Sequence, residues 1–228
     1  MTAFFNRKCT MADTIVYIDG FNVYYGMFMN SPLRKFRWTN LSDYCRRWLK
    51  DDNVVKIYYF TSIVKGEAGA RQQKYLNALR TCPNVEVVLG KFQYMPISVK
   101  LSLYKTEPRF EFKRPQEKAT DVNIALQMFY DAISDNCEKM VLVSGDTDLA
   151  PACAWIKTIA PKRIHLCIPS FNRRKERLAT GVWKKKIGSD RISIVDKIVW
   201  LPTDLVRHCQ FPDVIEGPDG PIEKPPQW

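Results

Sequence analysis

Apolar, β-branched runs alternate with amphipathic stretches along most of this chain, and the alternation limits the folds that it can adopt. Each run is short and nearly continuous in apolar residues, which is typical of a strand buried on both faces. Strands that alternate with helices are joined by right-handed crossovers, which build a mostly parallel sheet with helices on both faces. The predicted fold class is therefore α/β, with strands at 14–19, 54–62, 85–90, 139–145 and 163–169 and helices at 41–50, 70–82, 117–136 and 148–160.

Several segments fall outside this alternation. Residues 1–12 are expected to form a flexible N-terminal arm, and residues 13–210 are expected to form one domain. Within that domain, alternating apolar and polar residues predict an inserted β-hairpin at about 91–114, and a basic C-terminal extension follows at about 171–210. Proline and glycine in residues 211–228 predict a disordered tail.

The formal net charge is +11 and the isoelectric point is near 9.3. A balance this basic indicates a polyanionic partner such as nucleic acid, although a basic surface can also serve solubility alone. The seven cysteines are odd in number and include no C-x-x-C pair, which argues against a disulfide framework or a zinc ribbon and favours a reducing compartment. No run approaches the roughly 18 apolar residues of a membrane span, so we expect a cytoplasmic protein without a membrane partner.

Aspartates occupy the positions where the predicted elements meet the carboxyl edge of the sheet. Asp19 ends the first strand, Asp146 and Asp148 follow the fourth, and Asp121 lies near the start of the long helix after the hairpin. These carboxylates converge if the first and fourth strands are neighbours. Two like charges about 4 Å apart repel by roughly 4 kcal/mol at an effective dielectric of about 20, and a divalent cation reverses that sign. Oxygen ligands without histidine or cysteine favour Mg²⁺ or Mn²⁺.

The same aspartates also have structural interpretations. Asp19 precedes Gly20 and can begin a turn, and Asp146 or Asp148 can cap the helix that follows, because aspartate is favoured at helix N-caps. Both interpretations stay open for each aspartate taken singly. The expected convergence of all of them at one edge favours a metal site.

Three motifs resemble, in order and spacing, the signatures of NYN domains, the LabA-like branch of the PIN-like nucleases. They are YIDGFNVYYG at 17–26, EKATDVNIA at 117–125 and VSGDTDLAP at 143–151, and the resemblance spans roughly residues 13–170. It implies a Rossmann-like, PIN-like α/β/α domain in which clustered acids bind a divalent metal and cleave RNA. The catalytic residues that it implies are Asp19, Asn22, Asp121, Asp146 and Asp148, and the four aspartates are the implied metal ligands.

Three flanking positions of these motifs are expected to contact RNA: Lys118, Ser144 and Thr147. Lys118 can equally be a solvated lysine in the first turn of a helix. One position departs from the family pattern, because members often carry a further aspartate six residues after the middle acid, and this chain has Gln127 there. An amide is a weaker metal ligand than a carboxylate, so whether the site holds one metal or two stays open.

A basic cluster just past the fifth strand is the preferred contact for a phosphate backbone, because it follows the active edge closely in sequence. Each phosphate that it neutralises would strengthen binding and steepen its salt dependence. A solvated basic surface is the alternative interpretation. The cluster consists of Arg173, Arg174, Lys175 and Arg177.

The expected function is that of a metal-dependent ribonuclease, in which water attacks an RNA phosphodiester in line and leaves a 5′-phosphate. Single-stranded RNA is the expected partner, cleavage of DNA is left open, and so is a homo-oligomer. The alternative is an RNA-binding module with a vestigial nuclease site, which Gln127 favours. A phosphatase of the haloacid dehalogenase type is disfavoured, because it needs a second acid two residues after the first-strand aspartate, where this chain has Phe21.

Overall fold

The computed structural model describes residues 11–100, 109–171, 183–187 and 190–228. Its centre is a six-stranded sheet in the order β10-β7-β6-β1-β2-β3, in which every neighbouring pair is parallel. All five predicted strands are present, and the sheet gains one more strand from the C-terminal part of the chain. The strands are β1 (Ala12–Asp19), β2 (Asp52–Thr61), β3 (Val85–Leu89), β6 (Lys139–Val143), β7 (Arg163–Ile168) and β10 (Lys197–Trp200).

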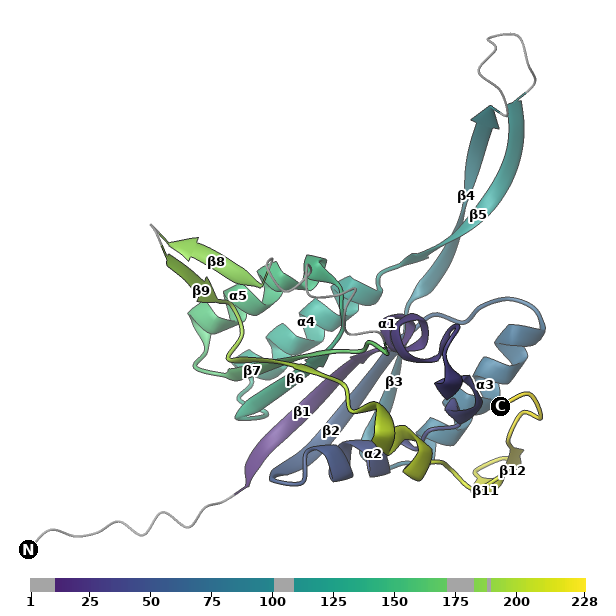
Figure 1. The fold of residues 1–228 in the computed structure, drawn as a ribbon, viewed down its shortest axis with the longest axis horizontal. Coiled ribbons are helices and arrows are strands. Elements are labelled where there is room, and N and C mark those ends of the chain that lie inside the picture. The colour runs from purple at the N-terminus through teal and green to yellow at the C-terminus, as the bar shows by residue number, and fades with distance from the viewer. Residues whose placement is uncertain (1–10, 101–108, 172–182, 188–189) are drawn as a thin grey trace, which may run out of the picture.

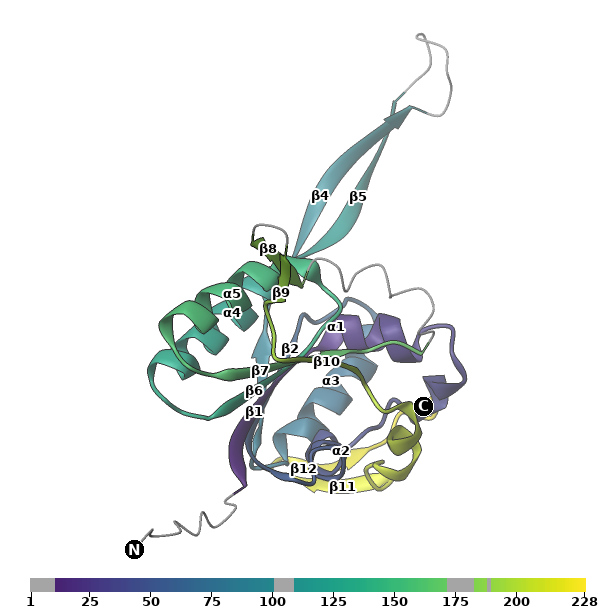
Figure 2. The same ribbon diagram turned by 60° about the vertical axis from the view of Figure 1, so that its left-hand side comes forward.

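Helices cover both faces of the sheet (Figures 1 and 2). The two faces show in the alternation along β1: Val16 and Ile18 pack into one buried cluster, and Ile15 and Tyr17 pack into the other. The first cluster includes side chains of α2 (Leu41–Trp48) and α3 (Glu67–Arg80), and the second includes side chains of α4 (Thr120–Ile133) and α5 (Ala150–Ile159). The predicted α/β class with a mostly parallel sheet is confirmed. None of the described helices is long and apolar enough to cross a membrane.

The strand order places β1 beside β6, with Ile18 opposite Val143 near the carboxyl ends of both strands. The chain leaves β1 through a short helix, α1 (Gly20–Val23), which continues as a π-helical turn, η1 (Tyr24–Phe28). A 3₁₀ turn, η2 (Pro32–Phe36), follows. After β6 the chain passes through another 3₁₀ turn, η3 (Thr147–Leu149), directly into α5. Both connections therefore begin at the same edge of the sheet.

An antiparallel hairpin lies where the sequence predicts one. Its strands are β4 (Lys91–Lys100) and β5 (Arg109–Lys118), so its second strand extends past the predicted end of the insertion. Figure 1 shows the hairpin projecting away from the body of the molecule. Because β5 ends at Lys118, the hairpin leads directly into α4. A shorter antiparallel pair, β8 (Lys184–Ile187) and β9 (Asp190–Ser193), follows β7.

The C-terminal segment differs from the disordered tail that its composition predicts. After a 3₁₀ turn, η5 (Thr203–His208), the chain forms a second small hairpin from β11 (Val214–Gly217) and β12 (Gly220–Glu223). After this hairpin, the Trp228 side chain packs on two aromatic rings. Its ring centroid lies 6.2 Å from that of Trp38 and 5.7 Å from that of Tyr75. Aromatic burial against the α3 side of the core therefore outweighs the loop-forming tendency of the prolines and glycines.

Candidate functional site

Asp19 is the last residue of β1, and its side chain caps the helix that follows. Its Oδ1 accepts a hydrogen bond from the backbone N–H of Asn22 at 3.0 Å. Its Oδ2 accepts from the Asn22 side-chain amide at 2.6 Å and from the Ser144 hydroxyl at 3.1 Å. The residue is only 3% exposed. The capping role is thus real, and it holds the carboxylate in a fixed orientation.

Burial raises the pKa of the Asp19 carboxyl above its ordinary value, because a desolvated carboxylate is disfavoured. Hydrogen bonds from Asn22 and Ser144 oppose this rise, and the nearby charge of Asp146 adds to it. The two aspartates at the ends of neighbouring strands therefore interact electrostatically. A cation bound beside Asp19 would favour its ionised form.

The loop after β6 is tied to α1 through the same asparagine. The backbone N–H of Gly145 donates to Asn22 Oδ1 at 3.0 Å. A Cβ at Gly145 would lie 3.2 Å from that oxygen, so the glycine permits the close approach of the two segments. Asn22 thus accepts from the loop after β6 and donates to Asp19 at the end of β1. An amide suits this role because it carries both a donor and an acceptor.

Asp146 begins the 3₁₀ turn η3 as its N-cap. Its backbone N–H donates to Ser144 Oγ at 3.0 Å, and its Oδ1 accepts from the backbone N–H of Asp148 at 2.9 Å. One oxygen of the Asp146 carboxylate is therefore used in the turn. Aspartate is favoured at such a position because its side-chain oxygen can accept from a backbone N–H two or three residues further along.

A cavity of about 110 Å³ opens between these strand ends and the start of α4. The α4 side begins at Ala119, whose backbone adopts a left-handed conformation with φ of 74° as the chain turns from the hairpin into the helix. Five of the predicted site residues are among those that line the cavity. The lining consists of Asp19, Phe21, Asn22, Lys118, Ala119, Thr120, Asp121 and Asp146.

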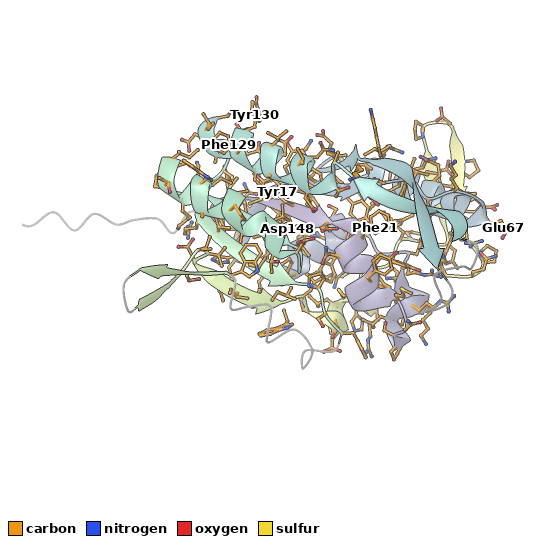
Figure 3. All side chains as sticks on the ribbon, turned by 90° about the horizontal axis from the view of Figure 1, so that it is seen from above. Tyr17, Phe21, Glu67, Phe129, Tyr130 and Asp148 are labelled. Carbon is orange, nitrogen blue, oxygen red and sulfur yellow. The ribbon has the colours of Figure 1, made fainter. Side chains whose placement is uncertain are left out.

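Other predicted site residues lie elsewhere. Asp148 is exposed and does not line the cavity; Figure 3 looks onto this region from above and labels it together with Phe21. Ser144 is fully buried with its hydroxyl on Asp19, so it positions that carboxylate instead of contacting RNA as expected. Thr147 is partly exposed in η3, outside the lining. The predicted basic cluster of Arg173, Arg174, Lys175 and Arg177 lies outside the described residues.

The lining suits a hydrated divalent ion better than an ion enclosed by protein ligands. Among the described residues, no group of three or more His, Cys, Asp or Glu side chains is close enough to hold a metal ion. Mg²⁺, however, is commonly held by one or two carboxylates and keeps several waters. Asp19 and Asp146 supply such a pair at one wall, and Asp121 lines the same cavity. The oxygen donors present therefore fit Mg²⁺ or Mn²⁺.

Gln127, the departure from the family pattern, faces the sheet. Its side-chain amide donates to Asp131 Oδ2 at 3.1 Å and to the Tyr58 hydroxyl at 3.2 Å. Asp131 is 1% exposed and accepts a further hydrogen bond from the Tyr17 hydroxyl at 2.8 Å. These residues form a buried polar network between α4 and the sheet. Asp131 is therefore engaged between α4 and the sheet and does not line the cavity.

Sequence reasoning assigned no role to two of the residues that shape this site. Phe21 lines the cavity, and Gly20 allows the chain to turn against β2, because a Cβ there would lie 2.7 Å from the Tyr59 ring and 2.8 Å from the Phe60 carbonyl oxygen. A glycine directly after a strand-terminal aspartate is the signal that could have indicated a close approach. The residues around Gly20 in the sequence did not indicate that β2 is the strand it approaches.

The chain is similar to one protein family, to one named protein and to one solved structure. The family model of the NYN domain matches residues 13–179. The 6-hydroxy-3-succinoylpyridine 3-monooxygenase HspA of Pseudomonas putida (strain DSM 28022 / S16) is 26% identical in an alignment 255 residues long. The alignment covers 94% of this chain and 75% of that protein. A crystal structure of a Vibrio parahaemolyticus protein of unknown function covers 90% of this chain and 98% of its own chain, with a TM-score of 0.48 and 15% identity.

Proposed function

This chain belongs to the NYN domain family of the PIN-like nuclease superfamily, and on that premise we propose that it is a metal-dependent ribonuclease. The observation that carries the proposal is the cavity at which Asp19 and Asp146, from neighbouring strand ends, meet Asp121 and Lys118. Carboxylates of this kind suit a divalent ion, and the lysine suits a phosphate. The assignment to the LabA-like branch stays a prediction.

Each residue has a distinct task in this proposal. Asp19 and Asp146 would hold Mg²⁺ or Mn²⁺, and Asp121, which lines the same cavity, would contact the ion through a bound water. The bound ion would supply charge neutralisation at a phosphoryl oxygen and a more acidic water. Asn22 keeps the two strand ends in register through its hydrogen bonds to Asp19 and Gly145. Lys118 would bind the phosphate of the substrate, and hydrolysis would leave a 5′-phosphate.

The test is cleavage of end-labelled single-stranded RNA with Mg²⁺ or Mn²⁺, followed on a denaturing gel. Asp146→Asn should abolish cleavage and leave binding in a gel shift intact, because the amide keeps the shape of the carboxylate but loses its charge. Asp219→Asn, at an exposed position of the C-terminal hairpin, is the matched control and should cleave as the wild type does. Equal cleavage by the Asp146 variant would refute the proposal.

An RNA-binding module with a vestigial site is the second candidate. It is favoured by the lack, among the described residues, of three acids close enough to share a metal. In that case the wild type shifts labelled RNA but yields no product with either metal, and Asp146→Asn shifts it equally. The same gels therefore separate the two candidates.

The Pseudomonas relative is named as a monooxygenase that acts on a hydroxylated pyridine, and the similarity spans most of this chain. This name makes oxidation of such a pyridine a competing expectation. It is tested by incubating the protein with 6-hydroxy-3-succinoylpyridine, oxygen and a reduced nicotinamide cofactor while monitoring the substrate by chromatography. Consumption of the substrate without RNA cleavage would replace the nuclease proposal.

We further propose single-stranded RNA as the partner and a cytoplasmic location. The net charge of +11 supports the former, and the free, buried state of all six described cysteines supports the latter. Self-association also stays a proposal. It is supported by apolar side chains exposed on α4 and α5, namely Val122, Leu126, Tyr130, Ile133, Trp155 and Ile159. Light scattering at several protein concentrations would test it.

A further inference from the structure

A second and larger cavity lies next to the acidic one and shares the Phe21 side chain with it. Its volume is about 430 Å³, which falls in the usual range of about 300–1,000 Å³ for sites that bind small ligands. Gly20, the residue directly after Asp19, also lines it. Both cavities therefore border the first residues of α1.

Eight of the 23 residues that line this cavity are aromatic. Tyr59 and Tyr75 meet edge to face with centroids 6.1 Å apart, and Tyr75 also contacts Trp228 at 5.7 Å. The Tyr75 hydroxyl already donates to the Thr39 carbonyl at 2.9 Å, and burial holds its pKa well above the ordinary value. On the inner wall the Tyr75 hydroxyl is thus already used, whereas the Trp228 indole N–H is buried without a hydrogen-bond partner among the described residues.

Two further tyrosines line the cavity close to solvent. Tyr25 is 57% exposed and Tyr24 is 37% exposed, and their rings meet edge to face at 5.3 Å. The Phe21 ring stacks on Tyr25 at 6.1 Å, so a continuous aromatic surface runs from the acidic cavity to the larger one. Exposed rings in this position can stack on an unpaired base without regard to its identity.

Positive charge gathers at the same cavity. Its lining includes Arg34, Lys65, Arg37 and Arg71 but, among the described residues that form it, no aspartate or glutamate. Arg37 lies over the Trp228 ring at 4.8 Å and donates to the Gln227 carbonyl at 3.2 Å.

The arginine side chains converge closely enough to affect one another. Burial lowers the pKa of the Arg37 guanidinium, and the charges of Arg34 and Arg71 lower it further, while Tyr24 opposes the change. Arg71 has one acidic partner, Glu67, at 3.4 Å, but the Glu67 side chain is 92% exposed. A net positive field therefore persists at the cavity, and an anion there would relieve the repulsion among the arginines.

From the aromatic wall, the excess of cations and the shared Phe21 side chain, we infer that the larger cavity binds one unstacked nucleotide of an RNA strand. Its base would lie against Tyr24 and Tyr25, and its phosphate would lie at Arg34 and Arg37. The inference rests on the proposed function, since the adjacent phosphodiester would then occupy the acidic cavity. It adds the reason for a preference for single strands: a paired base must first be unpaired and unstacked to enter the cavity, which costs free energy.

The inference is tested by isothermal titration calorimetry with 5′-mononucleotides, the corresponding nucleosides and nicotinate, all without divalent metal. Mononucleotides should bind, and nucleosides should bind about tenfold more weakly, because they lack the charge-assisted contacts to arginine. Arg34→Gln should reduce mononucleotide affinity to near that of the nucleoside. Lys35→Gln, the adjacent exposed cation outside the lining, is the matched control and should change neither affinity.

Two more variants complete the test. Tyr25→Ala should weaken mononucleotide and nucleoside alike, because it removes stacking and leaves the cations in place. Asp146→Asn should bind mononucleotides as the wild type does, so a failure of the nuclease proposal with this binding retained still supports the nucleotide site. Absence of mononucleotide binding would overturn the inference. Nicotinate binding as strong as mononucleotide binding and dependent on Arg34 would overturn it too, because the cavity would then be a site for small aromatic acids.

Discussion

Asn22 connects the ends of β1 and β6 through both ends of its side-chain amide, beside the direct hydrogen bond from Ser144 to Asp19. Its amide donates to Asp19 at 2.6 Å and accepts from the Gly145 backbone at 3.0 Å, and its own backbone N–H is capped by Asp19. Removal of the side chain leaves the Gly145 N–H without its acceptor and leaves Asp19 Oδ2 with the Ser144 hydroxyl as its remaining donor. The loop that carries Asp146 then keeps the Ser144–Asp19 hydrogen bond but loses its tie to α1.

We expect Asn22→Ala to lower the free energy of unfolding by about 1–3 kcal/mol, the usual cost of leaving buried polar groups unsatisfied. Urea denaturation monitored by tryptophan fluorescence measures this change. Asn53→Ala is the matched control, because its side chain makes an exposed hydrogen bond to Asp13 at 2.7 Å. The control should cost less than about 0.5 kcal/mol. Equal costs at the two positions would contradict the tying role of Asn22.

The raised pKa of Asp19 gives a prediction about pH and metal. Between its ordinary value and the raised value, the folded protein holds a proton that the unfolded chain has lost, so the free energy of unfolding falls as pH rises through this interval. A divalent cation favours the ionised carboxylate and should offset the loss. Melting temperatures measured between about pH 4 and pH 8 should therefore show stabilisation by Mn²⁺ that grows with pH. An equal effect of Mn²⁺ at every pH would count against Asp19 as a ligand.

At the scale of elements, the C-terminal segment has two structural roles. Its hairpin packs against α3, and Trp228 contacts Trp38 and Tyr75 while lying under Arg37. The Trp38 indole N–H also donates to the Pro212 carbonyl at 2.8 Å. This segment therefore stabilises the core and completes one wall of the larger cavity.

We expect Trp228→Ala to lower the free energy of unfolding by about 1–3 kcal/mol, less than a fully buried tryptophan because the side chain is only partly buried. It should also weaken mononucleotide binding, since the Arg37 guanidinium loses its support. Urea denaturation and calorimetry measure the two effects. Val214→Ala, a 52% exposed position on the same hairpin, serves as the control. Unchanged stability in the tryptophan variant would mean that the segment is not docked in solution.

For the whole molecule, 35 lysines and arginines stand against 24 aspartates and glutamates, which leaves an excess of positive charge. This excess favours binding to RNA and makes that binding sensitive to salt. For a single strand, each neutralised phosphate contributes about −0.7 to the slope of log affinity against log salt concentration. The slope for single-stranded RNA should therefore be negative, and Arg34→Gln should reduce its magnitude by about 0.7. Fluorescence anisotropy over a series of salt concentrations measures it. Affinity that does not change with salt would contradict a backbone-binding role.

The sequence predicted the elements well and their assembly only in part. The strands and helices follow from periodicities that extend over a few residues, and the position of each aspartate at a strand or helix end follows with them. The sequence did not predict that Ser144 is buried beneath Asp19 or that Asp148 lies outside the cavity. Those facts depend on how the loop after β6 packs against α1.

The sequence by itself determined an α/β chain with acids at its strand ends and a basic net charge, because local periodicity and composition suffice for these properties. Only the tertiary structure decided that β1 lies beside β6, that Phe21 borders two cavities, and that Trp228 packs on the core. Strand order and the docking of a distant end depend on the summed packing of segments far apart in the chain, which no local pattern contains.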